Sequence, residues 1–515
     1  MSSGDPKSRK LVVISLDAAE PSLVERWSDE GVLPNLRRLR AHSACGRLGS
    51  SADWLSGSPW PTFYTGTGPA EHGLYHAMQW RAETMAPVRP TADWLNSEPF
   101  WRFLPDSGRE VVVLDIPMTF APSAYGGTEI CGWATHDLLA PPAAEPGGVM
   151  SWARQTVGPR IVSEEIYGPQ KVKHLLALRD ELVFATRQLS DLAIAMMSEF
   201  PWDLFAVGFG ALHRGGHKLW DLSGSLGTVS PAKAAEFSDA LKEVYVACDS
   251  ALGTLLDYLD PEIPVLVFSL HGMGPNNSHI DLLPGMLGRV LEYDRDQAKK
   301  RESPLSLLKH VRDVVPIEVR SAIKDRLPLA VQDRLTSFWR LGGTDWSRTQ
   351  AFAAIADLQG YVRINLAGRE AAGIVEPGRA YDDLCRRIED GLRSFVDADS
   401  GAPIVRDVKR SAELYPEGRR LDRLPDLLVQ WEDAPAAAHR AIKSQTYGTI
   451  ARPRPGLNAD GRSGNHRPQG FYLLRDPARA QGPARTDAHI LDLAPTVLRL
   501  LAVEPPAHMK GRSLV

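Results

Sequence analysis

Short apolar runs of strand length alternate along this chain with longer amphipathic stretches. The apolar runs are residues 11–16, 111–116, 204–209, 265–270 and 427–431. Short, mostly apolar runs of this kind are typical of parallel strands that are buried on both faces. Between them, residues 182–200 and 234–259 carry apolar side chains at helical spacing. The alternation predicts an α/β fold with a doubly wound, mostly parallel sheet, covered by helices on both faces.

One internal region departs from this pattern. Residues 283–345 are dense in Lys and Arg, with polar helical stretches and no strong strand pattern. A chain of 515 residues can form one large domain with insertions or two or three smaller domains. We therefore expect an α/β core made of residues 1–282 and 346–515, with residues 283–345 inserted as a helical cap.

Charge and composition exclude several kinds of partner. The formal net charge is -4 and 24% of the residues are charged, so no basic surface for nucleic acid is expected. The first apolar run ends at Leu16, is too short to cross a membrane and lacks a small-residue cleavage site. We expect a soluble, cytoplasmic protein without a membrane partner, while its oligomeric state stays open. The four cysteines form no CxxC pair, which argues against a disulfide framework or a thiolate metal site.

Residues with metal-binding side chains follow three of the predicted strands. Asp17 and His271 come directly after strand-like runs, and His213 and His217 lie four residues apart just after another. On a helix, that spacing places both rings on one face, which suits a metal ion. His466 lies in a second motif, G-N-H-R-P-Q-G, near the C-terminus. The alternative is structural, with Asp17 as a helix cap and the histidines as buried or surface side chains.

A turn rich in hydroxyl groups offers candidate nucleophiles. Residues 56–73 read S-G-S-P-W-P-T-F-Y-T-G-T-G-P-A-E-H-G and lead into a short predicted helix. The positive end of a helix dipole favours an alkoxide and an incoming anion such as phosphate. Ser56, Ser58 and Thr62 all qualify on chemistry alone. A capped helix without catalysis is the competing interpretation.

Taken in order, these segments resemble the type I phosphodiesterase and nucleotide-pyrophosphatase family of the alkaline-phosphatase superfamily. The resemblance spans almost the whole chain. Its marks are V-V-I-S-L-D at 12–17, L-P-N-L-R-R-L at 33–39, T-F-Y-T-G-T-G-P-A-E-H-G at 62–73, Y-V-R-I-N-L-A-G-R-E at 361–370, P-D-L-L at 425–428, G-N-H-R-P-Q-G at 464–470, D-L-A-P-T-V-L at 492–498 and P-P-A-H-M-K-G-R-S-L at 505–514.

The resemblance implies a metal-dependent phosphoric-ester hydrolase that acts on a small-molecule phosphoester. Members of the family are two-metal enzymes, commonly with zinc, in which a Ser or Thr alkoxide attacks phosphorus. The nucleophile position matches Ser56, with Ser58 as the alternative because the alignment there rests on one Trp and one Pro. The ligand positions of the family match Asp17, His217 and His466.

Two ligand positions depart from the family pattern. The family's Asp four residues before His217 is His213 here, and its D-H-G triplet reads Leu270, His271 and Gly272. His213, His217 and His466 would form a three-histidine site that binds one zinc tightly and keeps a fourth position open. The second site is expected to hold its metal more weakly, since it retains only Asp17, Ser56 and His271. Mn or Mg is the alternative to zinc.

Other activities are set against the hydrolase. A sulfatase is disfavoured because no C-x-P-x-R or S-x-P-x-R sequence follows the hydroxyl-rich turn. A transferase of the same superfamily would keep the covalent intermediate and pass the group to an organic acceptor. A pseudoenzyme would bind an anionic metabolite without catalysis. Metal content separates the pseudoenzyme from the enzymes, and product analysis separates hydrolysis from transfer.

Overall fold

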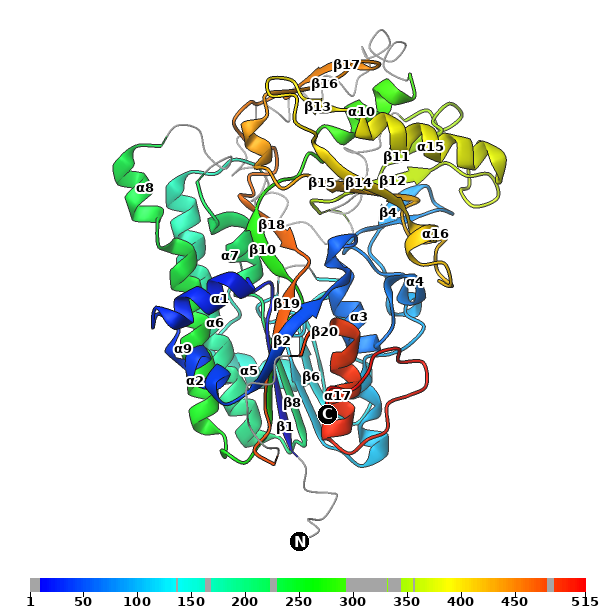
Figure 1. Cartoon of the computed structure of the whole chain (residues 1–515). Coiled ribbons are helices and arrows are strands. Elements are labelled where there is room, and N and C mark those ends of the chain that lie inside the picture. Colours follow the sequence, from blue (N-terminus) through cyan, green and yellow to red (C-terminus); the bar gives the residue numbers. More distant parts are fainter. Residues whose placement is uncertain are drawn as a thin grey trace.

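The computed structural model describes residues 10–135, 138–162, 168–222, 229–292, 331, 344–354, 357–478 and 486–515. Its centre is a nine-stranded sheet with the strand order β20-β2-β19-β9-β1-β8-β5-β6-β7 (Figure 1). The strands are β1 (Leu11–Leu16), β2 (Ala44–Gly49), β5 (Val111–Leu114), β6 (Thr128–Cys131), β7 (Ala143–Glu145), β8 (Leu204–Phe209), β9 (Val265–Ser269), β19 (Gly470–Arg475) and β20 (Ala488–His489).

The middle of the sheet is parallel. Strand β1 lies between β8 and β9, with Val12 opposite Phe205 on one side and Val265 on the other. Strands β5 and β6 continue the parallel order beyond β8. Strand β19 runs antiparallel to both β9 and β2, and β7 runs antiparallel to β6. The carboxyl ends of β9, β1 and β8 therefore meet at one edge of the sheet.

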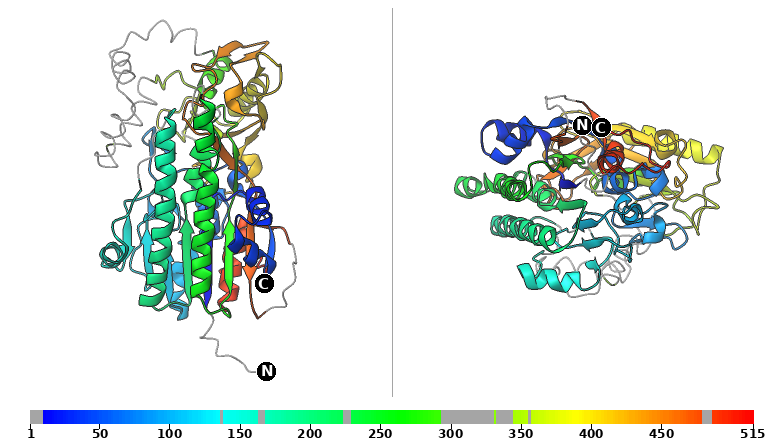
Figure 2. Two further views of the ribbon diagram at one scale, coloured as in Figure 1. Left: turned by 90° about the vertical axis from the view of Figure 1, so that its left-hand side faces the viewer. Right: turned by 90° about the horizontal axis from the view of Figure 1, so that it is seen from below.

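Both faces of this sheet are covered by helices (Figure 2). Along β1, Val12 and Ile14 join one hydrophobic cluster, and Leu11 and Val13 join another, as the two-residue period of a strand requires. The first cluster holds side chains of α1 (Pro21–Asp29), α2 (Pro34–Ala41), α5 (Val149–Val157), α6 (Val172–Glu199), α7 (Ala211–Leu219) and α9 (Ala240–Tyr258). The second holds side chains of α3 (Pro59–Thr65) and α17 (Leu493–Leu500). The predicted fold class is confirmed.

A smaller lobe lies beyond the carboxyl-terminal edge of the sheet, at the top of Figure 1. It has its own hydrophobic cluster. The lobe includes the helices α10 (Leu283–Val290) and α15 (Arg379–Arg393). A four-stranded sheet consists of β11 (Ala351–Ala353), β12 (Gly360–Ile364), β15 (Leu427–Trp431) and β14 (Val405–Arg410). A three-stranded sheet consists of β13 (Val396–Asp397), β16 (Ala441–Ser444) and β17 (Gly448–Ala451). Most of residues 283–345 lies outside the described residues, so the boundaries of the inserted cap stay a prediction.

Two details of the predicted elements were wrong. Residues 427–431 form β15, which is buried as expected but pairs antiparallel with β12 and β14 in the smaller lobe. An apolar run indicates that a strand is buried, but it does not specify which strand pairs with it or whether the pairing is parallel. The predicted helix 234–259 is two helices, α8 (Pro231–Phe237) and α9, because Asp239 leaves the helical conformation between them.

Buried ion pairs hold the strands of the smaller lobe together. The guanidinium of Arg363 donates to Glu370 at 2.7 Å, and that of Arg369 donates to Asp426 at 2.7 Å. The second carboxylate oxygen of Asp426 accepts the backbone N–H of Ile364, also at 2.7 Å. The motifs at 361–370 and 425–428 therefore serve the packing of β12 against β15. Among the described residues, no helix combines the length and apolar character needed to cross a membrane.

Candidate metal centre

The chain folds so that residues from four separate segments meet beyond the ends of β9, β1 and β8. Asp17 follows β1, His213 lies in the first turn of α7 after β8, and His271 follows β9. Strand β10 (Gly272–Pro275) continues from β9 and pairs antiparallel with β18 (Gly464–Arg467), which places His466 opposite Met273. The pairing of β10 with β18 brings the motif at 464–470 to the same edge of the sheet.

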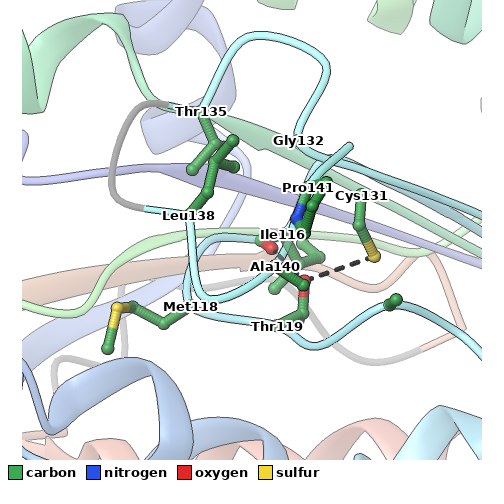
Figure 3. A pocket seen from close by; sticks show the side chains of 10 residues that line it. Ile116, Met118, Thr119, Cys131, Gly132, Thr135, Leu138, Ala140 and Pro141 are labelled. Carbon is green, nitrogen blue, oxygen red and sulfur yellow. Dashed lines mark hydrogen bonds between the residues drawn. The ribbon is translucent and has the colours of Figure 1, made fainter. Parts of the chain in front are cut away.

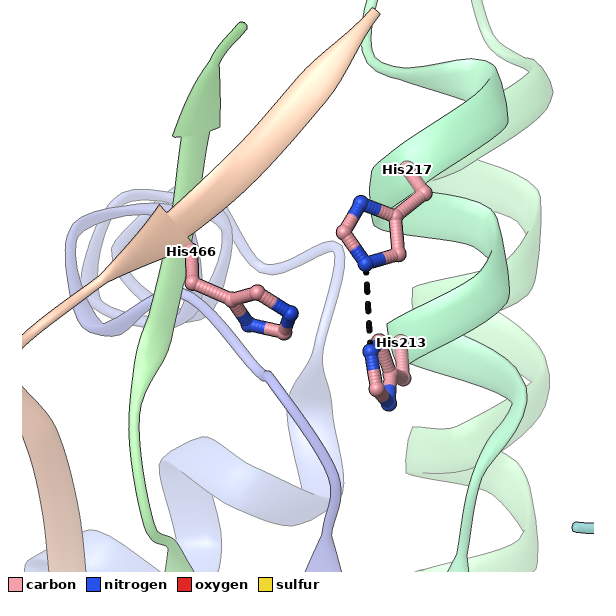
Figure 4. Close-up of side chains that lie close together, drawn as sticks. All are labelled: His213, His217 and His466. Atoms are coloured by element: carbon pink, nitrogen blue, oxygen red, sulfur yellow. Dashed lines mark hydrogen bonds between the residues drawn. The ribbon is translucent and has the colours of Figure 1, made fainter. Parts of the chain in front are cut away.

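Three histidines form the centre of this cluster. Helix α7 places His213 and His217 one turn apart on one face, and Figure 4 shows His466 reaching toward them from β18. One ligand nitrogen from each of the three lies within 4.8 Å of the others. The Nε2 atoms of His213 and His217 are 3.1 Å apart. The structure thus assembles the three residues that the sequence predicted to bind one metal.

In His213 and His217 the Nδ1 atoms are engaged in hydrogen bonds, which leaves the Nε2 atoms suited to bind a metal. His217 Nδ1 donates to the carbonyl oxygen of Gly464 at 3.0 Å, and His213 Nδ1 lies 2.9 Å from Asp17 Oδ2, which can only accept. In neutral rings, both Nε2 atoms then carry lone pairs that face each other. Two lone pairs at this separation need a proton or a cation between them. Two nitrogens bound to one tetrahedral zinc at about 2.0–2.1 Å would lie about 3.3 Å apart, so the residues fit a metal.

Burial keeps the imidazoles in the form that binds metals. Loss of solvent lowers the pKa of His217 well below its ordinary value and lowers the pKa of His271 to about 3. It also lowers the pKa of His466, against the opposing effect of the Asp357 carboxylate. These rings are therefore neutral near pH 7, and a metal does not have to displace a proton from them.

Asp17 and His271 lie beside the three histidines. Asp17 Oδ1 accepts the Nε1–H of Trp60 at 3.1 Å and lies 3.7 Å from His271 Nε2. His271 Nδ1 is 3.1 Å from His466 Nδ1. Asp17 and His271, two of the three residues expected to hold a second metal, are thus directly adjacent to the three histidines.

The two candidate serines differ in how their hydroxyl groups are used. Ser58 Oγ lies 2.7 Å from the carbonyl oxygen of Leu55 and 2.7 Å from Ser51 Oγ, so it is engaged in the turn before α3. The backbone N–H of Ser56 donates to the hydroxyl of Tyr361 at 3.3 Å. Within the described part of the chain, Ser56 Oγ is buried and has no hydrogen-bond partner. Thr62 Oγ1 is 3.0 Å from His72 Nε2, which gives that hydroxyl a local structural partner.

Leu270 is 1% exposed and belongs to the apolar cluster under α3 and α17. We expect Leu270→Asp to lower the free energy of unfolding of the metal-free protein by about 3 kcal/mol, because it buries a carboxylate among apolar groups. If the new carboxylate reaches Asp17 and His271, added zinc should raise the melting temperature of this variant more than that of the wild type. Leu270→Asn, which lacks the charge, is the matched control. A folded Leu270→Asp protein that binds no more metal than Leu270→Asn would show that position 270 does not serve the second site.

One carboxylate near the histidines was not predicted. Asp357 lies in the connection between β11 and β12, and its Oδ2 is 3.0 Å from His466 Nε2 and 3.8 Å from His217 Nε2. The apolar run A-F-A-A-I-A at 351–356 directly precedes it in the sequence, much as the run 11–16 precedes Asp17, and this signal was missed. A second signal was the loss of two family carboxylates, at His213 and Leu270.

A separate small pocket lies beyond the ends of β5 and β6 (Figure 3). Its free interior is about 10 Å³, enough for about one water molecule and too small for a phosphoester. Thr119 Oγ1 donates to Cys131 Sγ within its lining at 3.4 Å. None of the residues predicted for the active site lines it; the lining residues are Ile116, Met118, Thr119, Ala121, Cys131, Gly132, Thr135, Leu138, Ala140 and Pro141.

Comparison with solved structures finds proteins of similar fold. Two crystal structures of phosphonoacetate hydrolase from Sinorhizobium meliloti 1021, with phosphonoformate and with phosphonoacetate, are similar in fold. Their TM-scores are 0.53 and 0.50 at 12% and 13% identity, each covering 97% of this chain and 96% of the other. Murine ectonucleotide pyrophosphatase/phosphodiesterase 5 gives a TM-score of 0.48 at 11% identity, covering 98% and 97%.

At the level of sequence, none of the curated proteins matches this chain. The family model described as type I phosphodiesterase / nucleotide pyrophosphatase matches residues 11–453. That match covers most of the chain, and the fold is the alkaline-phosphatase-like α/β fold of the structures above. The chain belongs to the type I phosphodiesterase and nucleotide-pyrophosphatase family of the alkaline-phosphatase superfamily.

Proposed function

We propose that this protein is a metal-dependent phosphoric-ester hydrolase of the phosphodiesterase and nucleotide-pyrophosphatase type, with Ser56 as its nucleophile. The observation that carries the proposal is the meeting of His213 and His217, whose Nε2 atoms face each other 3.1 Å apart, with His466 beside them. Such a set of neutral nitrogen donors is typical of zinc sites. The substrate class proposed is a small phosphodiester or pyrophosphate.

A metal held by these histidines would supply a Lewis acid to the phosphoryl group. Ser56 Oγ would form a bond to phosphorus as the bond to the leaving oxygen breaks, and its proton would pass through solvent to the leaving oxygen. Water would then hydrolyse the phosphoserine, which releases the phosphoryl group and restores the hydroxyl. Its lack of a hydrogen-bond partner among the described residues supports this role, since the hydroxyl of Ser58 is engaged in its own turn. Asp17 would orient His213 by accepting its Nδ1–H.

The test is a screen of nitrophenyl phosphate monoesters, phosphate diesters and sulfates with protein that has been stripped of metal and then reloaded with zinc, manganese or magnesium. We expect metal-dependent release of nitrophenol from a diester and little from a sulfate. A protein that binds metal but turns over none of these esters would support the pseudoenzyme instead. Phosphoryl products captured by an added alcohol in place of water would support a transferase.

A further inference from the structure

The three-histidine cluster has a carboxylate that the family pattern does not supply. Asp357 comes from the smaller lobe, in the connection between β11 and β12, whereas the three histidines come from α7 and β18 of the core. Its Oδ2 lies 3.0 Å from His466 Nε2 and 3.8 Å from His217 Nε2. The side chain of Asp357 is 15% exposed and those of the two histidines are 2% exposed. The carboxylate is therefore enclosed together with the rings it approaches.

Charge balance gives this carboxylate a role. His213, His217 and His466 are neutral ligands, so a dication bound by them alone would keep its full charge in a buried setting. Two positions where the family has Asp are His213 and Leu270 here, which leaves Asp17 as the one anionic ligand inferred from the sequence. Asp357 would add a second carboxylate and lower the positive charge around the ion, although the guanidinium of Arg462 offsets part of its charge.

The separations agree with shared coordination of one ion. Two donor atoms at about 2.0–2.2 Å from a tetrahedral zinc lie roughly 3.3 Å apart. The Asp357–His466 separation is 3.0 Å and the His213–His217 separation is 3.1 Å. The other oxygen of Asp357 pairs with the guanidinium of Arg462, which would hold the carboxylate in place with Oδ2 toward the histidines.

We propose that Asp357 is a ligand of the metal bound by His213, His217 and His466, and that it replaces a carboxylate that the family pattern places on the core. It would take the fourth position that the histidines leave open, so a substrate would have to displace it or enter as a fifth ligand. The inference rests on the proposed metal-dependent function. Because the ligand set then spans both parts of the molecule, metal binding ties the β11–β12 connection to α7 and β18. Metal should therefore stabilise the smaller lobe as well as the core.

The test is titration of the metal-free protein with zinc and with cobalt. Calorimetry measures the affinity for zinc, and visible absorption reports the ligands of bound cobalt. Asp357→Asn should weaken zinc binding by more than about 100-fold, beyond the 10- to 100-fold expected when a group only orients a ligand. It should also change the visible spectrum of bound cobalt, because one ligand atom is altered. Asp383→Asn, an exposed carboxylate on α15 of the same lobe, is the control and should leave both unchanged.

A second variant separates coordination from charge pairing. Asp357→Asn leaves the buried guanidinium of Arg462 without that carboxylate, which could weaken metal binding by disturbing the fold. The double variant Asp357→Asn/Arg462→Gln removes both charges, so it should fold well and still bind zinc weakly if Asp357 is a ligand. Wild-type affinity in the double variant, or weaker binding with an unchanged cobalt spectrum, would overturn the proposal. Absence of metal binding by the wild type would instead overturn the proposed function.

Discussion

Ser56→Ala is expected to lower kcat toward a phosphate diester by about 10³- to 10⁶-fold, the range seen when a covalent nucleophile is removed. The free energy of unfolding should change little. Ser56 Oγ has no hydrogen-bond partner among the described residues, so its removal breaks no hydrogen bond there. Steady-state kinetics on the metal-loaded enzyme, together with urea unfolding of the same preparation, would measure both quantities.

Ser58→Ala is the matched control two residues away. It removes the hydroxyl that contacts Leu55 and Ser51, so it should lower the free energy of unfolding by about 1 kcal/mol while turnover stays within a few fold. Ser56→Ala is therefore expected to lower turnover and not stability, whereas Ser58→Ala is expected to lower stability and not turnover. If the Ser58 variant is the inactive one, the nucleophile has been misassigned by two residues. If both variants stay active, covalent catalysis by this turn is wrong.

His217→Ala should remove most of the tightly bound metal and, with it, the hydrolytic activity. The substitution deletes the Nε2 that faces His213 and the Nδ1–H that donates to Gly464. A site reduced from three nitrogen donors to two should lose zinc affinity by several orders of magnitude, because each ligand contributes directly to the binding free energy. Elemental analysis after gel filtration would give the metal content per chain.

The exposed His42 at the end of α2 provides the control, since His42→Ala removes an imidazole that is not among the predicted ligands. That variant should keep the metal content and activity of the wild type. His466→Ala should behave like His217→Ala. Metal retained at the wild-type level in both the His217 and the His466 variants would show that the ion, if bound, lies elsewhere.

The core of this fold could be predicted from the sequence because its parallel strands are buried on both faces. Strands β1 and β8 were predicted to the residue and β9 to within one residue, since their runs are apolar except for Ser15 and Ser269. The same argument placed Asp17, His213 and His271 together, because the carboxyl ends of adjacent parallel strands share one edge. His466 could be added only through the family resemblance, as β18 reaches the site by pairing with β10.

Other features depend on contacts that no local pattern encodes. The apolar run of β15 is indistinguishable from a core strand until its partners β12 and β14 are known. Asp357 lies more than 100 residues from each histidine it approaches, and the apolar run before it does not specify what it will lie beside. The fold of the smaller lobe brings the Asp357 carboxylate close to His217 and His466. The proposal of Ser56 rather than Ser58 as nucleophile likewise rests on hydrogen bonds of the turn, which are visible only in three dimensions.

Diffraction data collected on both sides of the zinc absorption edge, from crystals of the protein purified without chelator, would locate the metal. We expect one strong anomalous peak about 2.0–2.1 Å from ring nitrogens of His213, His217 and His466. A weaker peak between Asp17 and His271 should appear only after soaking at raised zinc concentration. Two equally strong peaks in unsoaked crystals would contradict the expected difference between the sites. A folded protein that shows no peak at the three histidines, even after soaking, would contradict metal-dependent hydrolysis at this centre.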